Sequence, residues 1–158
     1  MHNFVFVRQY RPGIERTCYE LCAGVCEKED ASPLVSAQRE LWEETGYGKG
    51  NWQEYMVISA NPSTHTYLTY CFLATDVELI DHQHLEATED ITVHLLTLEE
   101  VRSLLDKSPE KQDARIRQLF VDKASRSSLY IYCLLHNNLH KPPQAANYIL
   151  LSFDSIPR

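Results

Sequence analysis

The stretch that decides the fold and the chemistry runs Arg39-Glu40-Leu41-Trp42-Glu43-Glu44-Thr45-Gly46-Tyr47. It closes a predicted helix over Pro33–Thr45. Ser32 is placed to act as the N-cap, and the proline that follows it is favoured in a first helical turn. Gly46 is the residue type that commonly ends a helix in a left-handed conformation. Both ends of this helix are therefore predicted from local signals.

Three glutamates share one side of the predicted helix, because Glu40, Glu43 and Glu44 are three and four positions apart. Like charges at this spacing repel, and acids near the C-terminal end of a helix oppose its dipole. Both costs disappear if a hard divalent cation lies among the carboxylates, and oxygen ligands suit Mg²⁺ or Mn²⁺. The alternative is a solvated acidic face without metal. In either case the glutamates are predicted on the solvent side, opposite a buried arc formed by Leu34, Val35, Leu41 and Trp42.

Length and composition bound the class of protein. A chain of 158 residues makes about one domain, since domains commonly run to roughly 100–150 residues. Lys and Arg number 15 against 22 Asp and Glu, and a net charge of −7 excludes nucleic-acid binding by bulk charge. No apolar run is long enough to span a bilayer and no signal-peptide pattern is visible, so we predict a cytoplasmic protein without membrane contact. The five cysteines, an odd number, are predicted to be free thiols.

The remaining elements are predicted from hydrophobic periodicity and turn residues. A polar, acidic loop is expected over 81–90, in which His82 and His84 are interpreted as solvated. Strands are predicted over 3–10, 16–22, 54–59, 64–77 and 91–98, and helices over 98–105 and 113–122.

The composition changes after residue 124. The segment 125–158 carries few charges and a near-continuous apolar run over 129–135. We therefore predict one domain over 1–124 and an atypical C-terminal tail over 125–158. Three arrangements of the tail stay open: it packs on the domain, forms a dimer contact or is a poorly ordered extension. An exposed patch of this size predicts a homodimer if the tail does not fold back.

The acidic helix carries a recognisable family motif. From Gly24 onward the chain resembles the Nudix box: Gly, five residues, Glu, seven residues, then Arg-Glu-apolar-any-Glu-Glu-any-Gly-apolar. The second half matches at every specified position. In the first half, fourteen residues separate Gly24 from Arg39 where the family has thirteen. The first box glutamate, which pairs with the box arginine in the family, is represented by Asp30 or by Glu29.

The segments 7–13 and 19–24 extend the resemblance to the ADP-ribose pyrophosphatase and nucleoside diphosphate sugar hydrolase branch. The resemblance covers about 3–105. It implies an α/β/α sandwich around a mixed β-sheet, with the box helix lining the active site. Members of this branch usually carry a further N-terminal segment that helps them dimerise, whereas this sequence begins almost at the core strand. Whether this difference alters dimerisation or activity stays open.

The resemblance also implies a reaction and a metal. The reaction is Mg²⁺-dependent hydrolysis of the pyrophosphate bond of ADP-ribose or a related nucleoside diphosphate sugar, with Mn²⁺ as a second possible metal. The products are a nucleoside monophosphate and a sugar phosphate. The implied metal ligands are Glu40, Glu43 and Glu44, helped by the backbone carbonyl of Ala23.

Three further residues are implied at the substrate. Arg11 and Arg8 would face the diphosphate; the alternative for both is a salt bridge at the end of a strand. The general base is expected on the loop before the strand 91–98, where Glu89 is the first candidate and Glu86 the second. Two other functions stay open: a nucleoside triphosphate pyrophosphatase, and a non-catalytic, nucleotide-sensing domain with the same fold that acts on a partner.

Overall fold

The computed structural model describes residues 3–59, 63, 66, 68–106 and 148–154. The predicted helix over 113–122 and the apolar run over 129–135 lie outside the described residues, so the homodimer stays a prediction. Within the described part of the chain, no helix is long and apolar enough to cross a membrane.

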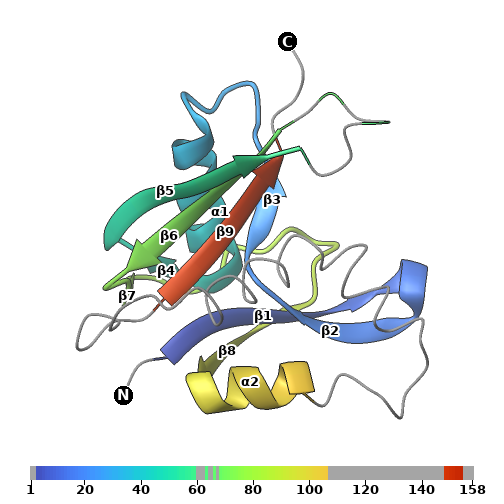
Figure 1. The fold of residues 1–158 in the computed structure, drawn as a ribbon. Helices are drawn as coiled ribbons and strands as arrows, with labels where there is room; N and C mark the ends of the chain where they lie inside the picture. Colours follow the sequence, from blue (N-terminus) through green and yellow to red (C-terminus); the bar gives the residue numbers. More distant parts are fainter. Residues whose placement is uncertain (1–2, 60–62, 64–65, 67, 107–147, 155–158) are drawn as a thin grey trace.

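The strands form one mixed sheet in two halves that meet at a single register pair, Phe4 with Tyr148. In the first half, β1 (Asn3–Arg11) pairs antiparallel with β2 (Arg16–Glu20) and with β8 (Ile91–Thr97). The second half runs in the order β3, β9, β6, β5, as Figure 1 shows. Its strands are β3 (Ala23–Val25), β9 (Tyr148–Asp154), β6 (Thr69–Thr75) and β5 (Asn51–Ile58). A separate short pair joins β4 (Tyr47–Gly48) to β7 (Glu78–Leu79).

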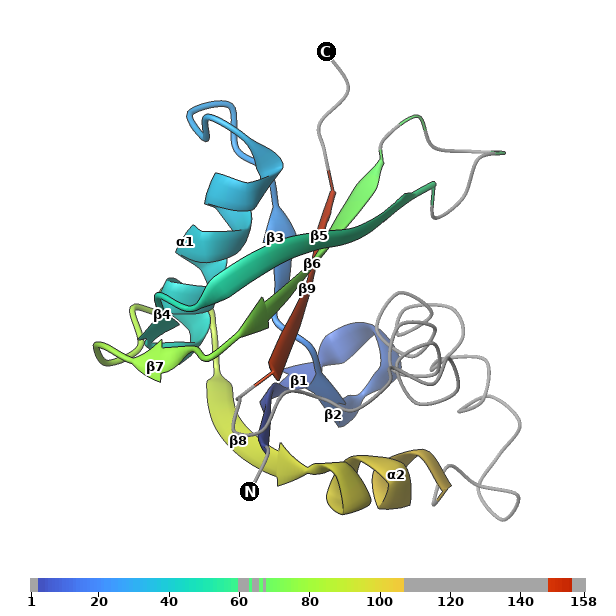
Figure 2. The same cartoon turned by 60° about the vertical axis from the view of Figure 1, so that its left-hand side comes forward.

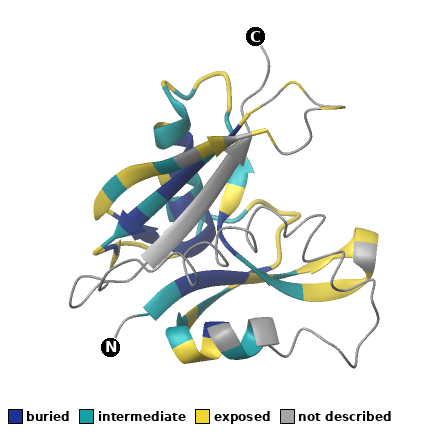
Figure 3. Cartoon of the chain, in the orientation of Figure 1, coloured by how far each residue is buried: buried dark blue, intermediate teal, exposed yellow. Residues whose placement is uncertain are grey.

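Two helices of the described residues cover opposite sides of these strands (Figures 1 and 2). α1 (Pro33–Thr45) packs on strands of both halves, namely β3, β9, β6 and β8, and α2 (Leu98–Asp106) packs on β8. A short 3-10 turn, η1 (Pro12–Ile14), links β1 to β2. This arrangement confirms the α/β/α sandwich around a mixed sheet. The buried residues gather on β1, β6 and the inner side of α1, as Figure 3 shows.

The ends of α1 form as the sequence predicts. The Ser32 hydroxyl accepts a hydrogen bond from the Val35 backbone N–H at 3.3 Å, which satisfies one of the free amides of the first turn. Gly46 adopts φ 73°, and its N–H donates to the carbonyl of Trp42 at 2.8 Å. The helix bounds 33–45 are confirmed.

The buried face of α1 differs from the predicted one. The residues that face the sheet are Ser36, Ala37, Leu41, Glu44 and Thr45, whereas Val35 is 40% exposed. On a helical wheel, where successive residues are 100° apart, the centre of this buried face lies about 100° from the centre of the predicted apolar arc. Small side chains at 36 and 37 let the helix approach the sheet closely, and Glu44 is drawn into the interface. The prediction that Glu44 lies on the solvent side is therefore wrong: it is 6% exposed.

Several strand bounds also differ from those predicted. The segment 16–22 is extended only to Glu20, and β3 begins after two buried residues, Leu21 and Cys22. β5 begins at Asn51, three residues before the predicted start, and the described part of the predicted strand 64–77 forms β6 from Thr69. The pair β4–β7 was not predicted. Cys18 and Cys22 are free thiols, as expected.

The tail contributes a strand to the sheet. β9 pairs with β6 along its whole length and with β3 at three positions. Packing on the domain is thus the arrangement that 148–154 adopt, of the three that the sequence left open. The boundary at residue 124 itself stays a prediction.

Candidate active site

Glu40 lies directly against the backbone of β3. A Cβ built on Gly24 would stand 2.3 Å from the Glu40 carboxyl carbon, a separation that atoms do not tolerate. Glycine at this position therefore lets the carboxylate reach the strand. Ala23 precedes it in β3, so the structure brings this predicted carbonyl ligand and Glu40 to one place.

Glu44 is the most buried acid of the group. Its Oε2 atom has no hydrogen-bond partner among the described residues. Burial raises the pKa of Glu44 to about 7; a hydrogen bond from the Cys22 thiol opposes the rise, and the charges of Glu40 and Glu89 add to it. Burial also raises the pKa of Cys22 well above its usual value, so the thiol stays protonated and can donate. A buried carboxylate oxygen is a strong hydrogen-bond acceptor, and this one has no donor among the described residues.

The other two box glutamates contact Arg39. Its Nη1 atom lies 3.1 Å from an oxygen of Glu40 and 2.9 Å from an oxygen of Glu43. Burial raises the pKa of Glu40 to about 7, and the positive charge of Arg39 opposes that rise. Burial is thus the largest cause of the raised pKa of both Glu40 and Glu44, and the charges of neighbouring glutamates add a smaller rise to each.

Arg39 is held from the other side by Asp30. The Arg39 Nη2 atom lies 3.0 Å from Asp30 Oδ2, and this contact raises the pKa of Arg39 and lowers that of Asp30. The same oxygen accepts from the Ser36 hydroxyl at 2.7 Å. Of the two acids that the sequence offered for this position, Asp30 therefore contacts the box arginine, and the extra residue of the loop does not prevent the pairing.

The predicted general base lies near the carboxylates. Glu89 is exposed on the loop before β8, and its charge is among those that raise the pKa values of Glu40 and Glu44. Its carboxylate accepts from the backbone N–H of Glu86 at 2.9 Å, and its own N–H donates to the Glu86 carbonyl at 3.0 Å. The two candidates thus form one turn.

The two predicted substrate arginines differ. The Arg11 guanidinium forms an ion pair with Glu20, with Nε 2.9 Å from Oε1, so the strand-end salt bridge is present. The positive charge of Arg11 still acts on the glutamate site, because it lowers the pKa of Glu44. Arg8 is exposed on β1, with its guanidinium carbon 5.8 Å from the ring centroid of Tyr19.

A segment that sequence reasoning missed holds the end of α1. We call residues 80–84 the clamp loop. The backbone N–H groups of Ile80 and Asp81 both donate to the carbonyl of Gly46, at 3.0 and 3.2 Å, and that of His84 donates to the carbonyl of Glu43 at 2.8 Å. The Gln83 side-chain amide donates to the carbonyl of Glu44 at 2.6 Å and to that of Ile91 at 3.1 Å. These bonds satisfy carbonyls that a helix end leaves free. No local sequence signal marks such a long-range cap.

The donor set suits a divalent cation that prefers oxygen. Glu40, Glu43 and Glu44 converge on one side of α1, next to a strand whose glycine leaves room for a carboxylate. Glu44 has an oxygen without a hydrogen-bond partner in the described part of the chain. Hard carboxylate and carbonyl oxygens are the ligands of Mg²⁺ and Mn²⁺.

Comparison with known proteins agrees with this geometry. A family model described as the NUDIX domain matches residues 1–120. The chain is similar to an ADP-ribose pyrophosphatase of Bacillus subtilis (strain 168), with 32% identity over 114 residues that cover 72% of this chain and 60% of the relative. It is also similar to a methanol dehydrogenase activator of Bacillus methanolicus, with 30% identity over 100 residues that cover 63% of this chain and 54% of the relative. The chain thus spans between half and two thirds of the length of these relatives.

Proposed function

The chain belongs to the Nudix family, and from this premise we propose that it hydrolyses the pyrophosphate bond of ADP-ribose or of a related nucleoside diphosphate sugar. Water attacks one phosphorus, and the bridging oxygen leaves with the other phosphate. The products are a nucleoside monophosphate and a sugar phosphate. The observation that carries the proposal is that Glu40 lies against Gly24, while Glu44, one turn further along the same helix, is buried with one carboxylate oxygen that has no hydrogen-bond partner among the described residues.

The proposed metal ligands are Glu40, Glu43 and Glu44, with the carbonyl of Ala23. Mg²⁺, or Mn²⁺ in its place, supplies neutralisation of the phosphate charge and a lower pKa for the attacking water. Arg39 supports the proposed ligand set, because one guanidinium contacts both Glu40 and Glu43 while Asp30 anchors its other side.

Glu89 is the proposed general base. Its exposed position on a loop allows the carboxylate to approach the attacking water when substrate is present. Its influence on the pKa of Glu44 supports a place near the reacting group. Arg11 is the proposed contact for the diphosphate, in exchange for part of its ion pair with Glu20, and Arg8 is the second.

The experiment is a substrate panel with Mg²⁺ in which the products are identified. The panel holds ADP-ribose, UDP-glucose, GDP-mannose, dinucleotides and nucleoside triphosphates. We expect the highest kcat/KM with a nucleoside diphosphate sugar, and AMP with ribose 5-phosphate from ADP-ribose. Glu44→Gln serves as the inactive control for contaminating hydrolases. Preference for triphosphates with release of pyrophosphate would replace the proposed substrate class by the alternative one.

A second candidate function is regulation of a partner enzyme. It is favoured by the relative from Bacillus methanolicus, whose name describes an activator of another enzyme. The two candidates differ in turnover: a sensing domain binds a nucleotide in the panel without releasing products. Binding of ADP-ribose in calorimetry, combined with no product from any substrate, would favour the sensing function over hydrolysis.

A further inference from the structure

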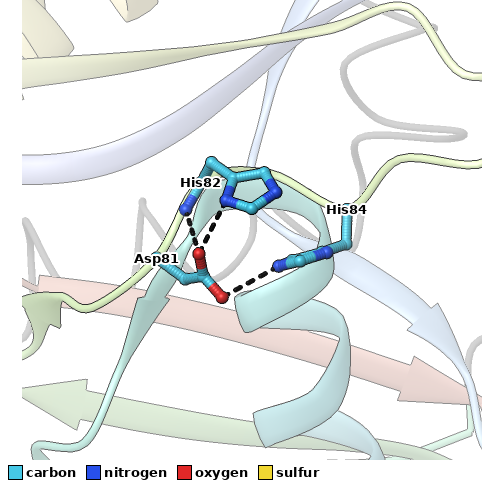
Figure 4. Close-up of side chains that lie close together, drawn as sticks. All are labelled: Asp81, His82 and His84. Atoms are coloured by element: carbon cyan, nitrogen blue, oxygen red, sulfur yellow. Dashed lines mark hydrogen bonds and ion pairs between the residues drawn. The ribbon is translucent and has the colours of Figure 1, made fainter.

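Three side chains of types that can bind a metal ion lie close together on the clamp loop, namely Asp81, His82 and His84. Figure 4 shows both imidazole rings turned toward the Asp81 carboxylate. His82 Nδ1 lies 2.7 Å from one carboxylate oxygen, and His84 Nε2 lies 3.0 Å from the other. One ligand atom from each residue lies within 4.8 Å of the other two. We propose that these residues form a binding site for a divalent transition-metal ion of the zinc type, distinct from the glutamate site.

The separations are close to those that such an ion imposes. A tetrahedral centre with ligand bonds of about 2.0–2.1 Å holds its ligand atoms roughly 3.3 Å apart. The widest separation in the cluster, at most 4.8 Å, must therefore shrink by no more than about 1.5 Å. Side-chain rotation alone supplies movements of this size. The cluster provides three ligands and leaves a fourth position open.

Contacts outside the cluster hold the His84 ring and the backbone of both His84 and Asp81. The His84 ring stacks on Trp42 of α1, with 4.1 Å between ring centroids and 30° between the planes. The backbone N–H groups of His84 and Asp81 donate to the carbonyls of Glu43 and Gly46. His82, whose side chain is 79% exposed, loses the most rotamer freedom when the ion binds, and the Asp81 carboxylate is held by the backbone N–H of His82 at 2.8 Å. A preoriented ligand set lowers the entropic cost of binding.

The donor atoms predict which ion is taken. Two imidazole nitrogens and one carboxylate oxygen suit Zn²⁺, Ni²⁺, Co²⁺ or Cu²⁺, whereas Mg²⁺ prefers an all-oxygen set and binds imidazole poorly. The glutamate site offers only oxygen. The two sites should therefore be loaded by different ions, and Mg²⁺ in excess should leave the clamp-loop site accessible to zinc.

The test is titration of the full chain with Zn²⁺ in excess Mg²⁺, followed by calorimetry. We expect His82→Ala to weaken one Zn²⁺ site by about 100-fold, because loss of even an outer-shell partner of a ligand costs roughly 10–100-fold. His84→Ala should do the same. His94→Ala is the matched control: this ring packs edge-on against Tyr19 at 5.1 Å, on β8 away from the cluster, and its loss should leave zinc binding unchanged.

Co²⁺ provides a second readout that separates this site from the cysteines. A nitrogen and oxygen site gives visible ligand-field bands without the near-ultraviolet charge-transfer band of a thiolate. The visible bands should disappear in His82→Ala. The His82 side chain is exposed, so its removal should leave the fold intact, and unchanged circular dichroism checks this. Zinc binding of equal stoichiometry and affinity in the parent, His82→Ala and His84→Ala would overturn the proposal. Displacement of zinc by Mg²⁺ would overturn it as well. The measurement needs no turnover, so it stands apart from the proposed hydrolysis.

Discussion

Replacing Glu44 by glutamine should abolish turnover and, without metal, stabilise the fold. The carboxylate is 6% exposed, and burial raises its pKa from the ordinary value of 4.5 to about 7. The two pKa values differ by 7 − 4.5 = 2.5, and each step of one in pKa corresponds to 1.36 kcal/mol. Above neutral pH the ionised Glu44 side chain therefore destabilises the folded state by about 3 kcal/mol. The glutamine amide still lacks a full set of partners, at a cost of about 1 kcal/mol or more. The net gain should be about 1–2 kcal/mol.

The sign of the pH dependence follows from the raised pKa. The folded state holds the Glu44 proton more tightly than the unfolded state, so the contribution of this group to stability is full below about pH 4.5 and is lost as the pH rises through about 7. Urea unfolding in EDTA at pH 5 and pH 8 measures it. The parent should lose more stability between the two values than Glu44→Gln does. Glu40 lies close enough to titrate with Glu44, so the profile reports the pair.

Glu43→Gln is the matched control on the same helix. It removes a second proposed metal ligand, but that side chain is one-third exposed and paired with Arg39, so its loss should give no gain in stability. Both variants should lose at least about 100-fold in kcat, because a bound metal supplies several kcal/mol of transition-state stabilisation. A Glu44→Gln protein with parental turnover, or with the parental pH dependence of unfolding, would refute this account of the site.

Four further variants test the neighbourhood of the glutamates. Glu89→Gln should lower kcat by about 10²–10⁴ with little change in the Mg²⁺ requirement, while Glu86→Gln should not; equal losses would place the base elsewhere. Gly24→Ala should raise the Mg²⁺ concentration that gives half-maximal activity and cost about 1–3 kcal/mol in urea unfolding, because its Cβ would stand 2.3 Å from the Glu40 carboxyl carbon. Gln83→Leu should speed hydrogen exchange at the C-terminal end of α1 and raise the Mg²⁺ requirement, because two backbone carbonyls lose their donor. Unchanged exchange would show that the backbone bonds of the clamp loop suffice.

The sequence predicts the parts of the site that depend on local signals. Ser32 and Gly46 define the ends of α1 because capping is a short-range interaction. The pairing of Asp30 with Arg39 was one of two alternatives, since both acids lie on the loop before the helix. Local spacing alone could not choose between them, because the choice depends on how the loop folds.

The parts that sequence reasoning missed depend on long-range packing. A helical wheel places the buried face where the apolar residues are, but of these only Leu41 lies on the fully buried face of α1, which also holds Ser36, Ala37, Glu44 and Thr45. Small side chains there bring a charged group close to the strand, which is an arrangement that hydrophobicity does not reveal. Gln83 reaches back 39 positions to the carbonyl of Glu44, and nothing in its neighbours indicates that contact.

The strand that flanks Gly24 has a kinetic consequence. Gly24 pairs with Phe153 of β9, and 153 − 24 = 129 positions separate them. Contacts between such distant positions raise the contact order of the fold, because the entropy of closing the intervening loop must be overcome before the pairing stabilises anything. The pairing of β3, the strand that Glu40 packs against, with β9 is thus one of the slowest contacts to form. During refolding, helical signal should return ahead of catalytic competence, and the lag between the two would report the docking of β9.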